Sequence, residues 1–226
     1  MPQAVVLSWS GGKDSSLALV ALQADDRYDV VGLLTSITSG YDRVSIHGVR
    51  RELVDAQAAE IGLPLYEVML APASSNEAYE TAFLAALARV HAAAPDVRLI
   101  AFGDLYLEDV RAYRERLVRS AGFEPVFPLW GRDTTRLSGD FIMQGFGAVL
   151  VCVDTTQLAG SFAGREFDAA LIAELPAEVD PCGEGGEFHT FVHSGPVFRR
   201  PIRVRCGDTV LRDGRFMYCE LLPGGA

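Results

Sequence analysis

An apolar run that passes through a glycine pair into a helix-like segment, at residues 4–24, constrains this chain more than any other feature. Residues 4–7 have the composition of a buried parallel strand, and an apolar period resumes near Ser15, as in a helix. Between them, Gly11 and Gly12 let the backbone approach a ligand without a Cβ in the way. Because the first N–H groups of such a helix point into the loop, the stretch predicts a phosphate site.

The side chains of this loop support the same prediction. Lys13 adds a compact cation, and Asp14 is expected either to cap the helix or to hold a phosphate-bound magnesium ion. Hydroxyl donors follow at Ser10, Ser15 and Ser16. The spacing matches neither G-x-x-x-x-G-K-[ST] nor G-x-G-x-x-G. An ordinary strand-to-helix turn uses the same residue types, but the flanking strand and helix favour nucleotide binding.

The length and composition indicate a compact globular protein. A chain of 226 residues can hold one large α/β domain, or one domain with a smaller appendage. No apolar run is long enough to span a bilayer, and the N-terminus lacks the pattern of a signal peptide. We therefore expect a cytoplasmic protein with no membrane partner.

The charge and the cysteines argue against nucleic-acid-binding, disulfide-rich and zinc-binding proteins. A formal net charge of −10 disfavours a general nucleic-acid partner, which requires clustered Lys and Arg. A solvated strand face explains the local basic bias of Arg199, Arg200, Arg203, Arg205, Arg212 and Arg215. Four cysteines without a C-x-x-C pair favour reduced thiols over a disulfide framework or a zinc site; they are Cys152, Cys182, Cys206 and Cys219.

Strand-like and helix-like segments alternate through the first half of the chain. Strands are expected at residues 4–7, 30–35, 65–70 and 99–102, and helices at 15–24, 49–61, 74–93 and 107–120. Ser74 and Glu77 fit a capping box for the third helix, and the polar residues 36–48 fit a ligand-contacting loop. The alternation predicts a Rossmann-like α/β fold, in which helices cover both faces of a parallel sheet.

The pattern changes after Phe127. A helix at 135–144, a strand at 148–153, a helix at 166–174, a loop at 176–186 and a strand at 188–193 are expected. Asp213-Gly214 between two strand-like runs indicates a closing β-hairpin. We therefore predict a nucleotide-binding domain at residues 1–127 and a smaller α+β domain at residues 128–226.

A second group of reactive residues lies at 180–192, where acids and glycines alternate. A metal site could use Glu187, His189 and His193, but their strand spacing separates the two histidines. A nucleophilic Cys182 needs a lowered pKa, which neighbouring carboxylates oppose. A substrate-binding loop, with acids as acceptors and His189 as a proton carrier, fits best.

Together the two motifs, S-G-G-K-D-S at residues 10–15 and C-G-E-G-G-E-F-H-T at residues 182–190, resemble those of the diphthine–ammonia ligase family, a branch of the PP-loop ATP pyrophosphatases. The similarity extends through four shorter pieces, F-G-D at 102–104, P-L-W at 128–130, G-F at 145–146 and G-P-V-F at 195–198. Residues 45–50 depart from the Phe-His-Thr pattern of members that act on diphthine in elongation factor 2. The resemblance therefore implies ATP chemistry without identifying the amidated acid.

The resemblance implies that a substrate carboxylate attacks the α-phosphorus of Mg-ATP and that ammonia then displaces AMP. ATP is expected to lie against Ser8, Ser10, Gly11, Gly12, Lys13, Asp14, Ser15, Leu34 and His47, with Leu34 at the end of the second strand reading adenine. The acceptor is expected at Gly183, Glu184, Gly185, Gly186, Glu187, His189 and Thr190. Chemistry is assigned to Lys13, Asp104, Glu187 and His189, and Mg²⁺ binding to Asp14 and Asp104.

Several alternatives stay open at this point. Asp104 could instead cap the following turn, His47 could be merely solvated, and Arg111 and Arg114 fit surface charges. The acceptor could be protein-borne diphthine or a small metabolite, and a homodimer is left open. The rival functions are a tRNA-modifying enzyme with the same ATP loop and a non-catalytic ATP-binding module.

Overall fold

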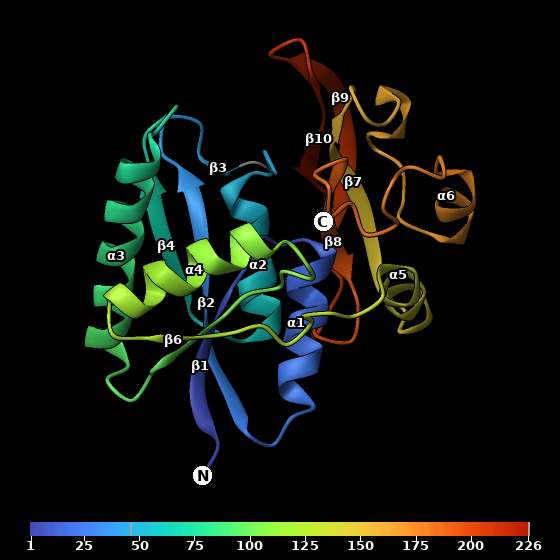
Figure 1. Cartoon of the computed structure of the whole chain (residues 1–226). Coiled ribbons are helices and arrows are strands. Elements are labelled where there is room, and N and C mark those ends of the chain that lie inside the picture. Colours follow the sequence, from blue (N-terminus) through green and yellow to red (C-terminus); the bar gives the residue numbers. More distant parts are fainter. Residues whose placement is uncertain (46, 226) are drawn as a thin grey trace.

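The first sheet carries the N-terminal half of the protein (Figure 1). The structure, a computed structural model, describes residues 1–45 and 47–225. Five strands run parallel, in the order β4-β2-β1-β5-β6, and short β3 pairs antiparallel with β2. Their bounds are β1 Gln3–Ser8, β2 Tyr28–Thr38, β3 Arg43–Val44, β4 Leu65–Leu70, β5 Leu99–Ala101 and β6 Glu124–Val126.

Helices cover both faces of this sheet, as predicted. The alternation of β1 shows why, since Val5 and Leu7 pack in one buried cluster with α1 (Lys13–Gln23) and α2 (Arg51–Ile61). Val6 points the other way, into a cluster with α3 (Asn76–Ala93) and α4 (Glu108–Ser120). Both faces of the sheet are therefore buried under helices. The loops at its carboxyl edge are the part of this sheet that can contact a ligand.

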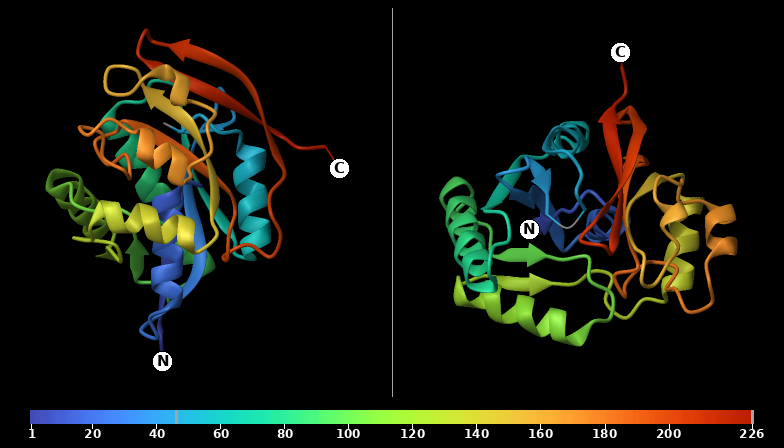
Figure 2. Two further views of the ribbon diagram at one scale, coloured as in Figure 1. Left: turned by 90° about the vertical axis from the view of Figure 1, so that its right-hand side faces the viewer. Right: turned by 90° about the horizontal axis from the view of Figure 1, so that it is seen from above.

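A second, antiparallel sheet follows, in the order β8-β7-β10-β9. Its elements are α5 Thr134–Met143, β7 Gly147–Asp154, the 3₁₀ turn Gly160–Phe162, α6 Ala169–Glu174, β8 Phe188–Ser194, β9 Val204–Arg212 and β10 Phe216–Pro223. The predicted hairpin is confirmed, with φ of 53° at Asp213 and 62° at Gly214, as a tight two-residue turn requires. Figure 2 shows this sheet beside the first one, on the side of α1.

The two sheets share one core. The cluster that contains Leu7 also contains Phe141, Val149 and Phe191 from the second half of the chain. Among the described residues, no helix is long and apolar enough to cross a membrane. The division into domains at residue 127 stays a prediction, since the buried cluster runs across that point.

Several predicted boundaries are wrong. Strand β2 runs on to Thr38 because it pairs with β4 as far as Leu70, and β3 occupies part of the predicted loop. Helix α1 begins at Lys13. The cap of α3 is Ser75, whose Oγ accepts from the N–H of Ala78, while the Ser74 hydroxyl donates to the Ala71 carbonyl. The predicted helix 166–174 is reduced to α6, because Asp168 caps it.

Candidate functional site

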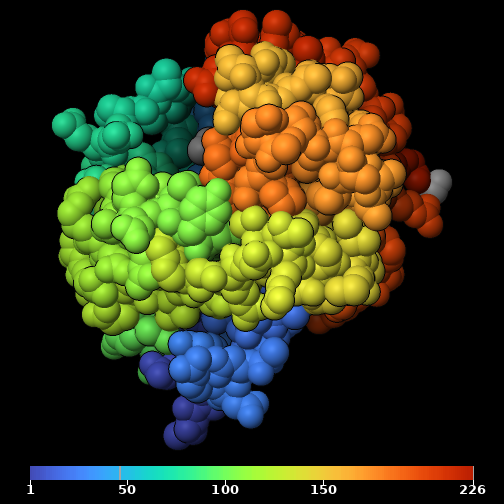
Figure 3. Space-filling view, turned by 45° about the vertical axis from the view of Figure 1, so that its right-hand side comes forward, coloured from blue at the N-terminus to red at the C-terminus, as the bar shows by residue number. Residues whose placement is uncertain are grey.

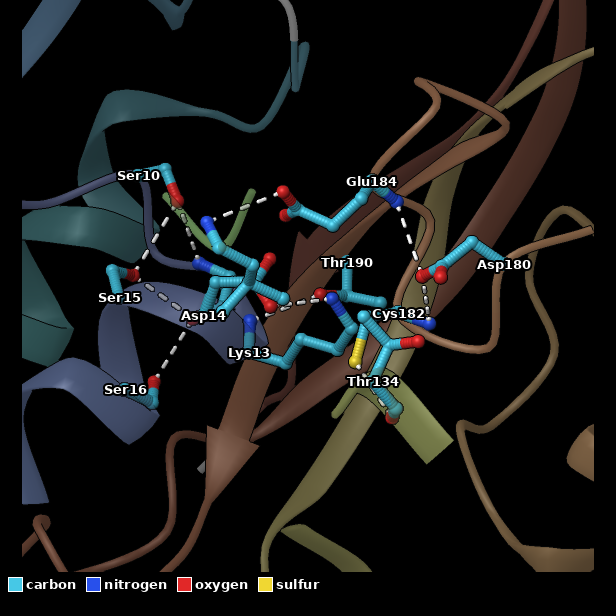
Figure 4. Close-up of polar contacts among 12 residues, drawn as sticks. Ser10, Lys13, Asp14, Ser15, Ser16, Thr134, Asp180, Cys182, Glu184 and Thr190 are labelled. Atoms are coloured by element: carbon cyan, nitrogen blue, oxygen red, sulfur yellow. Dashed lines mark hydrogen bonds and ion pairs between the residues drawn. The ribbon is translucent and has the colours of Figure 1, made fainter. Parts of the chain in front are cut away.

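The loop between β1 and α1, here called the phosphate loop (residues 8–12), lies at the carboxyl edge of the first sheet. Gly11 has a φ of 79°, which favours glycine. The Ser10 Oγ accepts from the N–H of Gly12 at 3.2 Å, and the hydroxyls of Ser15 and Ser16 donate to the Gly12 carbonyl at 2.9 and 3.1 Å (Figure 4). The serine hydroxyls thus hold the loop in shape before any phosphate binds.

Strand β8 brings the second motif against the phosphate loop. The N–H of Lys13, the first helical residue, donates to Thr190 Oγ1 at 3.0 Å. The N–H of Val192 donates to the Gly11 carbonyl at 2.9 Å. A Cβ on Gly12 would lie 3.0 Å from the Thr190 carbonyl oxygen, so any larger residue would crowd β8 at this close approach. The two motifs therefore form one site, and Thr190 caps α1 although it lies 177 residues from Lys13 in the chain.

Gln57 of α2 joins the same elements and was not predicted from the sequence. Its side chain is fully buried; Oε1 accepts from the Trp9 indole N–H at 2.9 Å. Its Nε2 donates to the carbonyls of Gly11 and Val192 at 3.0 and 2.6 Å. A polar residue on the apolar face of the predicted helix 49–61 was the signal that could have identified it.

We expect Gln57→Leu to lower the free energy of unfolding by about 3 kcal/mol, because it leaves the buried Trp9 indole N–H without a partner and removes the side-chain donor to the Gly11 and Val192 carbonyls. Denaturant unfolding measures this loss. Gln144→Leu, at the exposed end of α5, is the matched control and should change stability by less than about 0.5 kcal/mol. Equal effects of the two substitutions would show that Gln57 does not connect the motifs.

Lys13 lies at the centre of the site. Its side chain is 2% exposed, its Nζ lies 2.6 Å from Asp14 Oδ1, and the ammonium lies 5.9 Å above the Phe188 ring. Burial lowers the pKa of Lys13, but attraction to Asp14, Cys182 and Glu184 outweighs it and the pKa is raised. The site therefore holds a permanent, desolvated cation beside the phosphate loop.

Glu184 is a partly buried acid of the second motif with an unusual pKa. Its Oε2 accepts from the N–H of Leu105 at 3.4 Å, at the carboxyl end of β5. Burial, with the nearby charges of Asp14 and Asp104, raises the pKa of Glu184 to about 7. A carboxyl group that titrates near neutrality can accept or donate a proton under cellular conditions.

Glu187 instead stabilises its own loop. Its side chain is buried, and Oε1 accepts from the N–H of Asp180 at 3.0 Å. A Cβ on Gly185 would lie 2.9 Å from that oxygen, which explains the glycine. Gly183 and Gly186, with φ of 71° and 81°, allow the tight turns of the same loop. Through Oε1, Glu187 thus holds the loop that carries Glu184, while its buried Oε2 has no hydrogen-bond partner among the described residues, and its contact with the acceptor stays a prediction.

Cys182 is buried beside the site but is not activated. Its Sγ donates to the Thr134 carbonyl at 3.3 Å. Burial raises the pKa of the Cys182 thiol to about 12, with Asp14, Asp180 and Glu184 adding to the rise against the lowering effect of Lys13. A thiol with this pKa is protonated at neutral pH and is a poor nucleophile.

Two histidine rings lie against each other in the site. The rings of His47 and His189 lie 4.6 Å apart at 39°. Burial lowers the pKa of His47 to about 3, with further lowering by His189 and Lys13. Burial and Lys13 lower the pKa of His189 to about 4. Both imidazoles are therefore neutral near pH 7, and His47 is held in contact rather than left in solvent.

A cavity of about 680 Å³ opens from the phosphate loop between β2, α3 and α4. Figure 3 shows a hollow on this side, between the teal segment near residue 75 and the orange and red C-terminal segments. The lining includes Ser8, Trp9, Ser10, Leu34, Thr35, Ser36, His47, Tyr79, Asp109, Tyr113 and Arg114. Its size and mixed lining suit a nucleotide-sized ligand.

Leu34 reaches this cavity in a different way from that predicted. Strand β2 does not end at Leu34. The backbone carbonyl of Leu34 accepts from the N–H of Trp9 at 2.7 Å, so it is already used within the protein. Thr35, the next residue, is 1% exposed, and its Oγ1 finds no partner among the described residues. A buried, unpaired hydroxyl on the cavity wall is the better candidate for a base contact.

Asp104 and Arg114 face each other beside the cavity, with Asp104 Oδ2 2.6 Å from Arg114 Nε. The Arg114 guanidinium lies 4.6 Å above the Phe102 ring, so Arg114 is not the free surface charge that was expected. Arg111 is also held, above the rings of Phe127 and Trp130 and 2.8 Å from Glu115.

The residues predicted to bind Mg²⁺ have suitable chemistry but form only part of a site. Asp14 and Asp104 supply carboxylates, the ligands that Mg²⁺ prefers. Burial raises the pKa of Asp14 against the lowering effect of Lys13, and the nearby charge of Asp104 adds to the rise. Within residues 1–45 and 47–225, no group of three metal-ligating side chains gathers. Mg²⁺ would therefore take most of its ligands from phosphate and water. His193, the third residue of the alternative metal site, instead lies 3.1 Å from Glu166.

These observations define an α/β protein with a parallel sheet, a glycine-rich loop at the amino end of its first helix, and a second antiparallel sheet whose β8 closes on that loop. Residues 3–125 match the family model described as diphthamide synthase N-terminal domain, and residues 133–218 match its C-terminal domain. The chain belongs to the diphthamide synthase family, as its two motifs indicated.

Two curated relatives have the same name. A "Diphthine--ammonia ligase" of Schizosaccharomyces pombe is 26% identical over 219 residues, covering 85% of this chain and 34% of that protein. The chain thus spans about a third of that relative's length. One of Danio rerio is 25% identical over 221 residues, covering 89% of this chain and 86% of that protein. A solved structure titled as a "predicted subunit of tRNA methyltransferase" from Methanocaldococcus jannaschii aligns with 88% of this chain and all of its own, with 17% identity and a TM-score of 0.41.

Proposed function

We propose that this protein is an ATP-dependent, AMP-forming ligase that adenylates a substrate carboxylate and transfers ammonia to it. One observation carries the proposal: β8 brings Thr190 against Lys13 at the end of the phosphate loop, and Ser8, Trp9 and Ser10 of that loop line a nucleotide-sized cavity. Membership of the diphthamide synthase family supports it.

In the first step, an oxygen of the acceptor carboxylate attacks the α-phosphorus of ATP, and the bond from that phosphorus to the β-phosphate oxygen breaks. Ser10, Gly11, Gly12 and Ser15 hold the phosphates, and Lys13 offsets the charge that develops as pyrophosphate leaves. Mg²⁺ held by Asp14 and Asp104 would neutralise further phosphate charge. The neutral rings of His47 and His189 limit repulsion of the cationic groups nearby.

In the second step, the nitrogen of ammonia attacks the acyl carbon and AMP leaves with the oxygen that linked it. The attacking nitrogen gives up one proton, and Glu184 in its ionised form accepts it. Glu187 and the glycines at 183, 185 and 186 hold the loop that presents Glu184. Chemistry is thus assigned to Lys13 and Glu184, with Glu187 as a positioning residue.

A second cavity, of about 610 Å³, gives the acceptor a route to this site. It shares Thr38, Val44, Ser45 and Ala73 with the nucleotide cavity, and Arg212 and Tyr218 of the C-terminal hairpin form its far wall. We propose that the acceptor enters here while the nucleotide occupies the first cavity. Nothing in this arrangement requires the acceptor to be small.

The reaction is tested by incubating the protein with Mg-ATP, ammonium and elongation factor 2 carrying diphthine, and separating the nucleotides by chromatography. We expect AMP and pyrophosphate in equal amounts, with a mass loss of 1 Da on the acceptor as a carboxylic acid becomes an amide. Formation of ADP would contradict the proposal. AMP formation with tRNA but not with the acidic acceptor would favour a tRNA-modifying enzyme, and ATP binding without turnover would favour a binding module.

A further inference from the structure

Two cations lie at the carboxyl edge of the first sheet, and each is paired with an acid. Lys13 Nζ lies 2.6 Å from Asp14 Oδ1, and Arg114 Nε lies 2.6 Å from Asp104 Oδ2. The first pair follows β1 and the second connects the end of β5 with α4. These two strands are neighbours in the sheet, so the pairs lie at adjacent strand ends. The two acids are also the carboxylates predicted to bind Mg²⁺.

The Asp104–Arg114 pair is close but poorly aligned. Both atoms are buried, and among the described residues neither makes a hydrogen bond of acceptable geometry. Buried polar atoms are normally hydrogen-bonded, so a guanidinium N–H on a cavity wall that is held only by a misaligned ion pair can take a better-aligned partner. Arg114 lines the cavity, and three of the six such atoms in the described part belong to lining residues, Thr35, His47 and Arg114.

Arg114 is held where a small movement would bring it to a ligand. Its guanidinium stacks above Phe102, and its charge affects Tyr79, which is itself beside Ser36 on the cavity wall. The side chain is 27% exposed and that of Asp104 is 16% exposed. Stacking on Phe102 fixes the plane of the Arg114 guanidinium, while the N–H groups at its edge can still exchange one hydrogen-bond partner for another.

We propose that Arg114 is a second phosphate-binding cation of the nucleotide site, held by Asp104 until a divalent cation takes that carboxylate. The inference rests on the proposed function, because the ligand is the triphosphate of ATP. Lys13 and Asp14 form the matched pair at the neighbouring strand end, so binding exchanges both ion pairs at once. Asp14 and Asp104 would hold Mg²⁺, and Lys13 and Arg114 would then be free to bind phosphate oxygens.

Charge balance gives the reason for this exchange. A triphosphate entering alone meets the carboxylates of Asp14, Asp104 and Glu184, which repel it, and finds Arg114 already neutralised. With Mg²⁺ on the carboxylates, the repulsion becomes attraction and Arg114 is released. An Arg fork binds two phosphate oxygens at once, which a lysine cannot do. Nucleotide and Mg²⁺ are therefore expected to bind cooperatively.

The test uses isothermal titration calorimetry with α,β-methylene-ATP, which cannot be cleaved between the α and β phosphorus. Titrations with and without Mg²⁺ are compared for the wild type, Arg114→Gln, Arg114→Lys and Asp104→Asn. Arg119→Gln is the matched control, since Arg119 is on the same helix but pairs with Glu115 and Glu124 outside the cavity. Thermal unfolding of each variant confirms that it is folded.

We expect Arg114→Gln to weaken binding with Mg²⁺ by about tenfold or more, with Arg114→Lys in between and Arg119→Gln unchanged. Asp104→Asn should change the two affinities in opposite directions. The affinity for metal-free nucleotide should rise several-fold, because Asp104 no longer holds Arg114. The increase in affinity that Mg²⁺ produces should become smaller. Binding by Arg114→Gln within twofold of the Arg119→Gln control, or a weaker metal-free affinity of Asp104→Asn, would overturn the inference. Absence of nucleotide binding by the wild type would instead overturn the proposed function itself.

Discussion

Lys13→Met is expected to lower acceptor-dependent AMP formation by about a thousandfold, the loss that follows removal of one preorganised charge from a transition state. Lys13 has a buried side chain, and it is the cation closest to the phosphate loop at the start of α1. Water has little access to replace its charge when pyrophosphate leaves. The measurement is AMP release at saturating Mg-ATP and ammonium.

A second variant separates catalysis from stability. Lys13→Met leaves Asp14 beside Cys182 and Glu184 without its cation, so some loss of stability is expected from charge alone. The double variant Lys13→Met/Asp14→Asn removes that charge and should recover most of the thermal stability but none of the activity. If the double variant regained activity, or if Lys13→Met retained more than a tenth of it, Lys13 would have no part in the reaction.

The fold could be predicted because its signals are local. Each parallel strand is a short apolar run followed by polar or glycine residues, and each helix has a recognisable start or stop, such as Gly62 and Gly122, both with positive φ. The errors fall at the ends of strands and helices, because contacts with a neighbouring element decide where each one stops. Strand β2 continues to Thr38 because it pairs with β4, and the residues of β2 alone do not indicate that pairing.

The site could be predicted only as far as its motifs reach. The sequence indicated that residues 10–15 and 182–190 act together, and Lys13 donates its N–H to Thr190 as that idea requires. It could not distinguish Glu184 from Glu187, because both stand in one acid- and glycine-rich loop and only packing turns Glu187 inward. Gln57, Thr35 and Arg114 lie outside both motifs, and their roles depend on contacts between elements distant in the sequence.

Glu184→Gln is expected to lower the rate of amide formation by about a hundredfold and to remove its dependence on pH near neutrality. Burial and two neighbouring acids raise the pKa of Glu184 to about 7, so the wild-type rate should rise as the carboxyl group ionises through that pH. Glutamine keeps the acceptor oxygen for the Leu105 N–H but cannot take a proton. The measurement is the rate between pH 5.5 and pH 8.5 with acceptor and ammonium saturating.

The same substitution should act on stability in the opposite direction. The pKa of Glu184 is higher in the folded protein than its ordinary value of 4.5, so its contribution to stability is fully present below pH 4.5 and is lost as the pH rises through 7. At pH 8 the wild type holds a buried charge that glutamine lacks, and Glu184→Gln should be more stable by about 1 kcal/mol, since solvent screens part of the interaction. Below pH 4.5 the difference should vanish. A variant that loses activity while gaining stability at high pH marks a residue kept for chemistry; a loss of both would make Glu184 a structural residue of its loop.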